Sequence, residues 1–279
     1  MGNISDDDLV AITRSYYDSA DADNFYFYIW GGEDIHIGVY DEGVTDIAQA
    51  SRRTIEMMAA RLPRLDRTSR VIDLGAGYGG AARYLARTVG CHVTALNLSA
   101  KENTRCRAMS EIAGLADRIT VVEGSYEEIP LPDESIDVVW SQDAILHSGR
   151  KDNIFAEVSR VLRPGGDFVF TDPMESGTGS HEELQPVLER IRLASMGSFE
   201  RYARLANRVG LERVEFVDLT QHLVRHYARI RDELIRQRAA LENNISSDFA
   251  DRMLVGLDHW VGAGERGSLA WGVLHFRKA

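Results

Sequence analysis

Between residues 70 and 172, short apolar runs alternate with segments of helical periodicity. The apolar runs are VIDL (71–74), CHVTAL (91–96), RITVVEG (118–124), SIDVVWS (135–141) and DFVFTD (167–172), with a predicted helix from about Ser99 and another before RPGG (163–166). Buried strands that alternate with amphipathic helices are typical of a parallel sheet covered by helices on both faces. The pattern therefore predicts an α/β core.

The segments before residue 70 and after residue 172 have different hydrophobic patterns. Residues 5–20 and 45–62 have helical spacing, and the aromatic segment NFYFYIWGGEDIHIGVY (24–40) lies between them, where it can fold over the mouth of a pocket. After Asp172 come helical stretches, a strand-like run LERVEFVDL, a long helical region from about Thr220 to Trp260, and a closing strand SLAWGVLHFRK.

We therefore expect a Rossmann-like core of about seven strands, mostly parallel, with an N-terminal helical lid and an inserted helical cap. The expected boundaries are a lid over 1–67, a core over 68–172, a mainly helical cap over 173–265 with a core strand near 211–218, and a final core strand over 266–279.

Composition narrows the function. The formal charge of -11 argues against a nucleic-acid substrate, because phosphate binding needs a basic surface, so a small molecule fits better. No apolar run reaches the length of a membrane span, the N-terminal segment lacks the pattern of a secretory signal, and Cys91 and Cys106 offer no disulfide framework. We expect a cytoplasmic protein without membrane partners, either a monomer or a homodimer.

The histidines do not predict a metal site. None of the eight belongs to a closely spaced Cys/His ligand set, although His222 and His226 are four residues apart on a predicted helix. We interpret that pair as structural or close to the substrate.

A glycine-rich turn gives the strongest chemical signal. In VIDLGAGYGG (71–80) an apolar strand ends at Asp73, and glycines follow where a helix begins. Glycines let the backbone turn sharply and approach a ligand, as they do in the GxGxxG loop of NAD-binding proteins. Here the order D-x-G-x-G-x-G resembles motif I of class I methyltransferases, which implies that Asp73, Gly75, Ala76 and Gly77 bind the methionyl part of S-adenosylmethionine.

Later segments fall in the order expected of that class. Asn97 and Leu98 follow the second strand, where many methyltransferases have an acidic residue for the ribose hydroxyls; an amide can still form hydrogen bonds there. Ser125 and Tyr126 follow the third strand, where the class binds adenine, and Gln142 follows the fourth. The resemblance implies that these residues belong to the cofactor site, with S-adenosylhomocysteine as the product.

Longer segments resemble the sarcosine/dimethylglycine N-methyltransferases that make the osmolyte glycine betaine. They are YYDSADADNFYFYIWGGEDIHIG (16–38), DLGAGYGGAARYLA (73–86), LNLS (96–99), WSQDAILHSG (140–149), GGDFVFTDPM (165–174) and LDHWVGAGERGSLAWG (257–272). This resemblance implies stepwise methyl transfer to sarcosine and N,N-dimethylglycine.

Candidate acceptor residues lie in the same segments. Tyr26, Tyr28, Trp30 and Trp271 can offer aromatic faces to a methylated ammonium, and Met174 can offer an apolar contact to its methyl groups, although each also suits a hydrophobic core. The substrate carboxylate has candidate partners in His147, Gln142, Arg192, Arg201 and backbone amides, among which the sequence does not choose.

Asp143 and His147 are the candidate catalytic pair. If the intervening residues continue a helical turn, the carboxylate and the imidazole lie on one face and can hold the acceptor and take its proton. The DAILH string also resembles phosphoethanolamine methyltransferases, which implies that Tyr16 or Tyr17 pairs with His147, and we choose Tyr17.

Several alternatives stay open at this stage. Phosphoethanolamine enzymes have a tyrosine where this chain has Pro173, and a proline offers no hydrogen to a phosphate. Other small-molecule N-, O- or C-methyltransferases share the core. A binding module that has lost activity, or an NAD-binding protein, would predict a damaged glycine motif or an acceptor pocket without polar groups.

Overall fold

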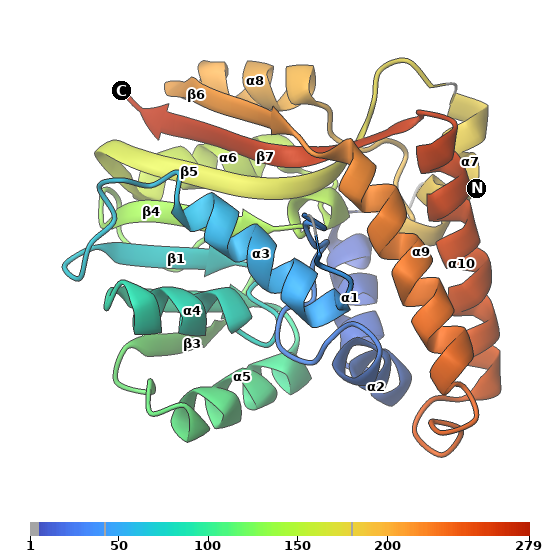
Figure 1. Ribbon diagram of the computed structural model, residues 1–279. Helices are drawn as coiled ribbons and strands as arrows, with labels where there is room; N and C mark the ends of the chain where they lie inside the picture. The colour runs from blue at the N-terminus through green and yellow to red at the C-terminus, as the bar shows by residue number, and fades with distance from the viewer. Residues whose placement is uncertain (1–5, 42, 180) are drawn as a thin grey trace.

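The computed structural model describes residues 6–41, 43–179 and 181–279. Seven strands form one sheet in the order β3-β2-β1-β4-β5-β7-β6, in which β7 runs antiparallel to both of its neighbours (Figure 1). Their bounds are β1 Arg70–Leu74, β2 His92–Asn97, β3 Ile119–Glu123, β4 Ile136–Gln142, β5 Leu162–Glu175, β6 Leu211–Asp218 and β7 Leu269–Lys278. The predicted α/β class and the mostly parallel sheet are confirmed.

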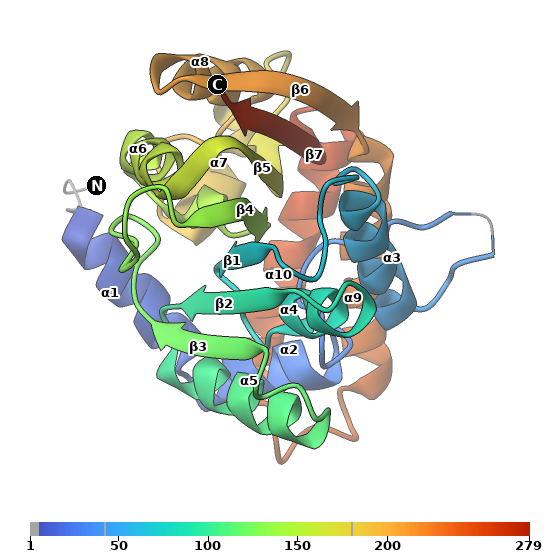
Figure 2. The same cartoon turned by 90° about the vertical axis from the view of Figure 1, so that its left-hand side faces the viewer.

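Alternate residues of the inner strands enter two separate cores. Val71 and Trp140 face one side of the sheet, while Ile72 and Val139 face the other, because successive side chains of a strand point in opposite directions. The first side is covered by α3 (Ile47–Ala59), α4 (Gly80–Thr88) and α5 (Ala100–Ile112), and the second by α6 (Lys151–Val161) and α8 (Phe199–Arg208) (Figure 2).

The N-terminal region has one more helix than the hydrophobic pattern predicts. In place of a single helix over 5–20, α1 (Asp6–Tyr17) is followed by α2 (Ala20–Tyr28), and residue 5 lies outside the described part of the chain. The break comes at Ser19, whose hydroxyl accepts a hydrogen bond from the backbone N–H of Ala22 and so caps α2. Because α2 is aromatic around its circumference, its periodicity is hidden in the sequence.

The helical region predicted over 220–260 is two helices. Helices α9 (Thr220–Gln237) and α10 (Ser247–Glu265) lie side by side, and α7 (His181–Ile191) packs against α10 (Figure 1). Helix α8 instead packs against α6 and β6. Helices α7, α9 and α10 thus form one group, whereas α8 belongs to the layer that covers the sheet.

Residues 37–40, which we call the strap, join the N-terminal helices to the sheet. Their backbone N–H groups donate to side chains of other elements: Ile37 to Asp143 at 2.7 Å, Gly38 to His226, Val39 to Thr54 and Tyr40 to His222, the last three at 3.1 Å. An extended segment without a sheet partner must satisfy its amides in some such way. This pairing explains the i,i+4 spacing of the two histidines on α9.

His226 acts as an acceptor and is neutral. Its Nδ1 accepts from the Gly38 N–H and lies 2.9 Å from the Tyr40 hydroxyl, while the ring is fully buried. Burial lowers the pKa of His226 to about 3, and the nearby His36 lowers it further. Protonation of Nδ1 would remove this hydrogen-bond acceptor, so the strap needs the neutral imidazole.

We predict that the contribution of His226 to stability depends on pH. Since its folded pKa of about 3 lies below the unfolded value of about 6.5, this stability is complete above pH 6.5 and is lost as the pH falls. Replacement by a non-titrating acceptor, His226→Asn, should reduce the free energy of unfolding at pH 7.5. Urea unfolding at pH 7.5 and 5.5 should show the gap to the parent protein narrow by about 1.4 kcal/mol.

The control is Thr54→Val, which removes another strap acceptor but no titrating group. Its deficit should be the same at both pH values. A His226→Asn deficit that also stayed constant would contradict the neutral-imidazole interpretation.

Candidate active site

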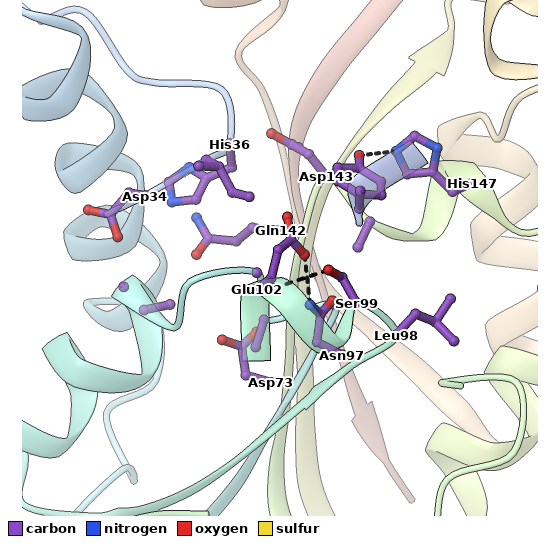
Figure 3. Close-up of a pocket in the computed structure, with 18 of the residues that line it drawn as sticks. Asp34, His36, Asp73, Asn97, Leu98, Ser99, Glu102, Gln142, Asp143 and His147 are labelled. Atoms are coloured by element: carbon purple, nitrogen blue, oxygen red, sulfur yellow. Dashed lines mark hydrogen bonds between the residues drawn. The ribbon is translucent and has the colours of Figure 1, made fainter. Parts of the chain in front are cut away.

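A cavity opens where the parallel strands end. Asp73 is the buried penultimate residue of β1, Asn97 ends β2 and Gln142 ends β4. All three side chains line this cavity, which we call the first cavity (Figure 3). It lies where β1 separates β2 from β4, so successive connections leave the sheet in opposite directions. Ligands of open α/β sheets bind at such a switch point.

The glycine loop leaves room for Ala144 and for Asp34. Gly75 has φ 75°, and a Cβ atom there would lie 2.4 Å from the Cβ of Ala144. At the start of α4, a Cβ on Gly80 would lie 1.7 Å from Oδ1 of Asp34. The loop between α2 and α3 thus places a carboxylate directly over the N-terminus of α4, where the helix dipole favours negative charge.

Three carboxyl groups around the first cavity are buried: Asp34, Asp73 and Glu102. Burial raises the pKa of each to about 7, and the charge of Asp34 adds to the rise for Asp73. Arg52 pairs with Asp34 at 2.9 Å, yet Oδ1 of Asp34 has no hydrogen-bond partner among the described residues. Carboxyl groups held in this way favour a cationic ligand, which would restore their ionised form.

Glu102 is a site residue that the sequence reasoning missed. It lines the first cavity, is 3% exposed, and accepts a hydrogen bond of 2.7 Å from the side-chain amide of Asn97 (Figure 3). The available signal was the capping-box spacing from Ser99 to Glu102. Ser99 does cap α5 by accepting from the Glu102 N–H, but the carboxylate turns toward Asn97.

A second cavity lies beneath the N-terminal helices. Its walls carry aromatic rings of α1, of α2 and the segment that follows it, and of the C-terminal helices: Tyr16, Tyr17, Tyr26, Trp30, Tyr227, Phe249 and Trp260. Six residues line both cavities: Thr13, Tyr17, Ile35, His36, Asp143 and His147. The two cavities therefore meet at these six residues.

Asp143 and His147 are not on one helical turn, which corrects the sequence prediction. Strand β4 ends at Gln142, Asp143 has a left-handed φ of 52°, and only Ile145–His147 form a 3-10 helix. Oδ2 of Asp143 accepts from Ile37 N–H at 2.7 Å and Oδ1 from the indole N–H of Trp271 at 2.8 Å. Asp143 thus ties the strap to β7.

His147 faces Tyr17 instead. Its Nε2 lies 3.1 Å from the Tyr17 hydroxyl. Burial lowers the pKa of His147 to about 4, with a smaller effect from Lys151, and raises that of Tyr17 well above its usual value. Both groups are neutral at pH 7, so the phenol can donate to the imidazole.

A buried polar network holds the loop that carries His147. The ammonium of Lys151 donates to the carbonyls of Leu146 at 3.2 Å and Ser148 at 2.6 Å. Asp172 accepts from the Leu146 N–H at 2.9 Å and from the Tyr202 hydroxyl. Lys151 and Asp172 are both buried, so an amine and a carboxyl group support the loop from within the core.

The structure brings only some of the predicted acceptor residues to the second cavity. Tyr26 and Trp30 line it, whereas Tyr28 is 42% exposed and outside it. Trp271 is fully buried and donates a hydrogen bond to Asp143. Met174 lies in the core outside both cavities.

The other predicted residues are divided in the same way. Gln142, Leu98 and Tyr126 line the first cavity but not the second. Ser125 lines neither cavity. Arg192 lines the second cavity, but Arg201 donates to Ser195 and the Met196 carbonyl outside it.

Two further searches cover the residues described in the structure. No group of three or more His, Cys, Asp or Glu side chains is arranged to hold a metal ion. No described helix combines the length and the apolar character that crossing a membrane would need.

Comparison with known proteins defines the class first. Residues 72–170 match the family model of a methyltransferase domain. The matched range runs from β1 into β5 and includes most of the residues that line the first cavity. The fold is therefore that of a methyltransferase.

Relatives over the full chain define the family. A sarcosine/dimethylglycine N-methyltransferase of Halorhodospira halochloris is 48% identical over 278 residues, which cover 100% of both chains. A dimethylglycine N-methyltransferase of Parasynechococcus marenigrum is 49% identical over 96% of both chains. A crystal structure of a proposed sarcosine dimethylglycine methyltransferase from Galdieria sulphuraria, 44% identical, superposes with a TM-score of 0.90 over 95% of this chain and 99% of that one. The chain belongs to the sarcosine/dimethylglycine N-methyltransferase family.

Proposed function

We propose that the chain transfers methyl groups from S-adenosylmethionine to the nitrogen of sarcosine and N,N-dimethylglycine, giving glycine betaine and S-adenosylhomocysteine. The observation that carries this proposal is the neutral Tyr17–His147 pair at the junction of an acid-lined and a tyrosine-lined cavity. The relatives' named substrates support the choice of acceptor.

The first cavity suits this cofactor. S-adenosylmethionine would supply a positively charged sulfonium with an electrophilic methyl group. Asp73 and Asp34 would hold its methionyl ammonium at the glycine loop, where Ala76 and Gly77 line the wall. Leu98 and Tyr126 would contact the adenine. Asn97 and Glu102 would bind the ribose hydroxyls, so that Glu102 supplies the carboxylate that Asn97 lacks.

The second cavity suits a methylated amine. The rings of Tyr17, Tyr26 and Trp30 can stabilise a substituted ammonium through cation–π attraction. The acceptor nitrogen must lose its proton before its lone pair can attack. A neutral His147, hydrogen-bonded to Tyr17, can accept that proton at Nε2 or orient the nitrogen through the phenol. Tyr17 and His147 are thus our proposed catalytic residues, and Asp143 positions the walls around them.

Direct transfer needs no covalent intermediate on the protein. The rate therefore depends on alignment of the amine with the sulfonium methyl and on exclusion of water. Helices α1 and α2 cover this junction through Tyr17 and Tyr26.

The acceptor proposal is tested by the formation of S-adenosylhomocysteine with glycine, sarcosine, dimethylglycine or phosphoethanolamine as the sole acceptor. We expect turnover with sarcosine and dimethylglycine and none with phosphoethanolamine, since Pro173 offers no N–H to a phosphate where it lines the second cavity. Turnover with phosphoethanolamine alone would move the assignment to that class of enzyme.

The role of Glu102 predicts a defect in cofactor binding. Glu102→Ala should weaken S-adenosylhomocysteine binding about 10- to 100-fold, the cost of a charge-assisted hydrogen bond. Isothermal titration calorimetry measures this directly. A cofactor analogue without the 2′- and 3′-hydroxyls should bind the variant and the parent protein equally.

The pair Asn97→Asp with Glu102→Gln, which puts the carboxylate at the end of β2, should recover most of the affinity. Exposed Glu111 on the same helix gives the control, Glu111→Gln, which should leave binding unchanged. An equal loss with the dideoxy analogue would refute the ribose assignment.

Tyr17 and His147 should act as a unit. His147→Ala should lower kcat about 10²- to 10⁴-fold, the range for a positioned acid–base group, and Tyr17→Phe by less. If the phenol works through the imidazole, Tyr17→Phe adds little in the His147→Ala background. Initial rates for the two single variants and the double variant give the comparison; multiplicative losses would show that the residues act separately.

The pH profile of the parent enzyme gives a second readout. Because the pKa of His147 is about 4, its imidazole is already neutral at pH 6. With saturating S-adenosylmethionine, which would keep the carboxyl groups of the first cavity ionised, the rise of kcat/KM for the acceptor from pH 6 to 9 should contain no ionisation of His147. A separate ionisation near pH 6.5 that disappears in His147→Ala would contradict this.

A further inference from the structure

The wall of the second cavity carries a guanidinium without an acidic partner. Arg190, in the last turn of α7, lines this cavity. Its Nη2 contacts the Met253 sulfur at 2.8 Å and its Nη1 donates to the Arg252 carbonyl at 3.3 Å. Among the residues that the structure describes, no carboxylate forms an ion pair with it. A thioether is a weak acceptor, so the charge of Arg190 is left for an anionic ligand.

Tyrosine side chains connect Arg190 to the reaction centre. The Met253 sulfur that contacts Arg190 also accepts from the Tyr16 hydroxyl at 3.7 Å, and that hydroxyl lies 3.5 Å from the hydroxyl of Tyr26. The Tyr26 ring stacks on Tyr17 with centroids 5.6 Å apart. The second cavity therefore has the Tyr17–His147 pair at one end of this tyrosine cluster and a cation at the other.

The positive charge of Arg190 is felt across the cluster. Burial raises the pKa values of Tyr16 and Tyr26, and the guanidinium opposes both rises. It has the same effect on Tyr227, which lines the cavity from α9. Arg190 thus acts on the interior of the cavity and not only on its rim.

We propose that Arg190 binds the carboxylate of the amino-acid acceptor and so directs its nitrogen toward His147. This inference rests on the proposed function. The acceptor is a short zwitterion with one carbon between its amine and its carboxylate. A guanidinium fork can hold both carboxylate oxygens and fix the direction in which the amine points. Arg190 would then make this wall of the second cavity selective for acceptors that carry a carboxylate.

The other arginines near the cavity fit this role less well. Arg192 is exposed and has a left-handed φ of 57°. The guanidinium of Arg252 lies over the Phe249 ring, 6.0 Å from its centroid. Of the three, Arg190 alone also contacts the sulfur on which the tyrosine cluster rests.

The test compares Arg190→Met and Arg190→Lys with the parent protein. Calorimetric titration of dimethylglycine into protein saturated with S-adenosylhomocysteine should show affinity about 10- to 100-fold weaker in Arg190→Met. Arg190→Lys keeps the charge but not the fork and should lie between. In steady-state assays the KM for dimethylglycine should rise by a similar factor.

A matched acceptor separates recognition from general damage. N,N-dimethylethanolamine has the same amine but no carboxylate, so its kcat/KM should be the same in Arg190→Met and the parent protein. Affinity for S-adenosylhomocysteine should also stay unchanged. Arg236→Met removes an exposed arginine that pairs with Glu233, and should leave every quantity at the parent value.

Three outcomes overturn the inference: parent-like dimethylglycine binding in Arg190→Met, an equal loss with dimethylethanolamine, or a loss found in Arg192→Met but not in Arg190→Met. These three outcomes can be distinguished from failure of the proposed function. If the proposed function fails, the parent protein itself neither binds nor methylates dimethylglycine, and both proposals are overturned together.

Discussion

The carboxylate of Asp143 holds the site together. One oxygen accepts from the strap at Ile37, the other accepts from Trp271 in β7, and the residue itself follows the end of β4. Three parts of the chain that are remote in sequence are thus fixed to one half-buried group. Burial raises the pKa of Asp143 to about 6, and the two N–H donors oppose that rise. The position of both cavities depends on these two hydrogen bonds.

The two cavities differ in charge: the first is lined by acidic side chains without a lysine or arginine, whereas the second has arginines beside acidic side chains. Acidic side chains surround the first cavity, where Asp34, Asp73 and Glu102 lie around the ends of β1 and β2. The second cavity offers neutral aromatic rings and the guanidinium of Arg190. A cationic methyl donor and a carboxylate-bearing acceptor would each bind on the side of opposite charge. Their reacting groups would then meet at the neutral Tyr17–His147 pair.

Much of the sheet could be predicted because strand and helix periods are local. The glycine loop could also be predicted from the sequence, since the order of glycines after Asp73 reflects backbone geometry. The contacts of Asp143, His222 and His226 could not be predicted, because their partners lie more than 100 residues away. Glu102 was missed for another reason: its capping-box spacing predicts a backbone partner, and only the fold shows the carboxylate turned to Asn97.

The strap also determines when the site can form. Its partners include His222 and His226 in α9, and the carboxylate that it contacts is held by Trp271, close to the C-terminus. Contacts of such long sequence separation form late, because a long loop must close first. On the ribosome the glycine loop and the first strands emerge early, but the walls of the second cavity stay unanchored until the last strand has been synthesised. The nascent chain therefore has its glycine loop and first strands well before either cavity can take its final form.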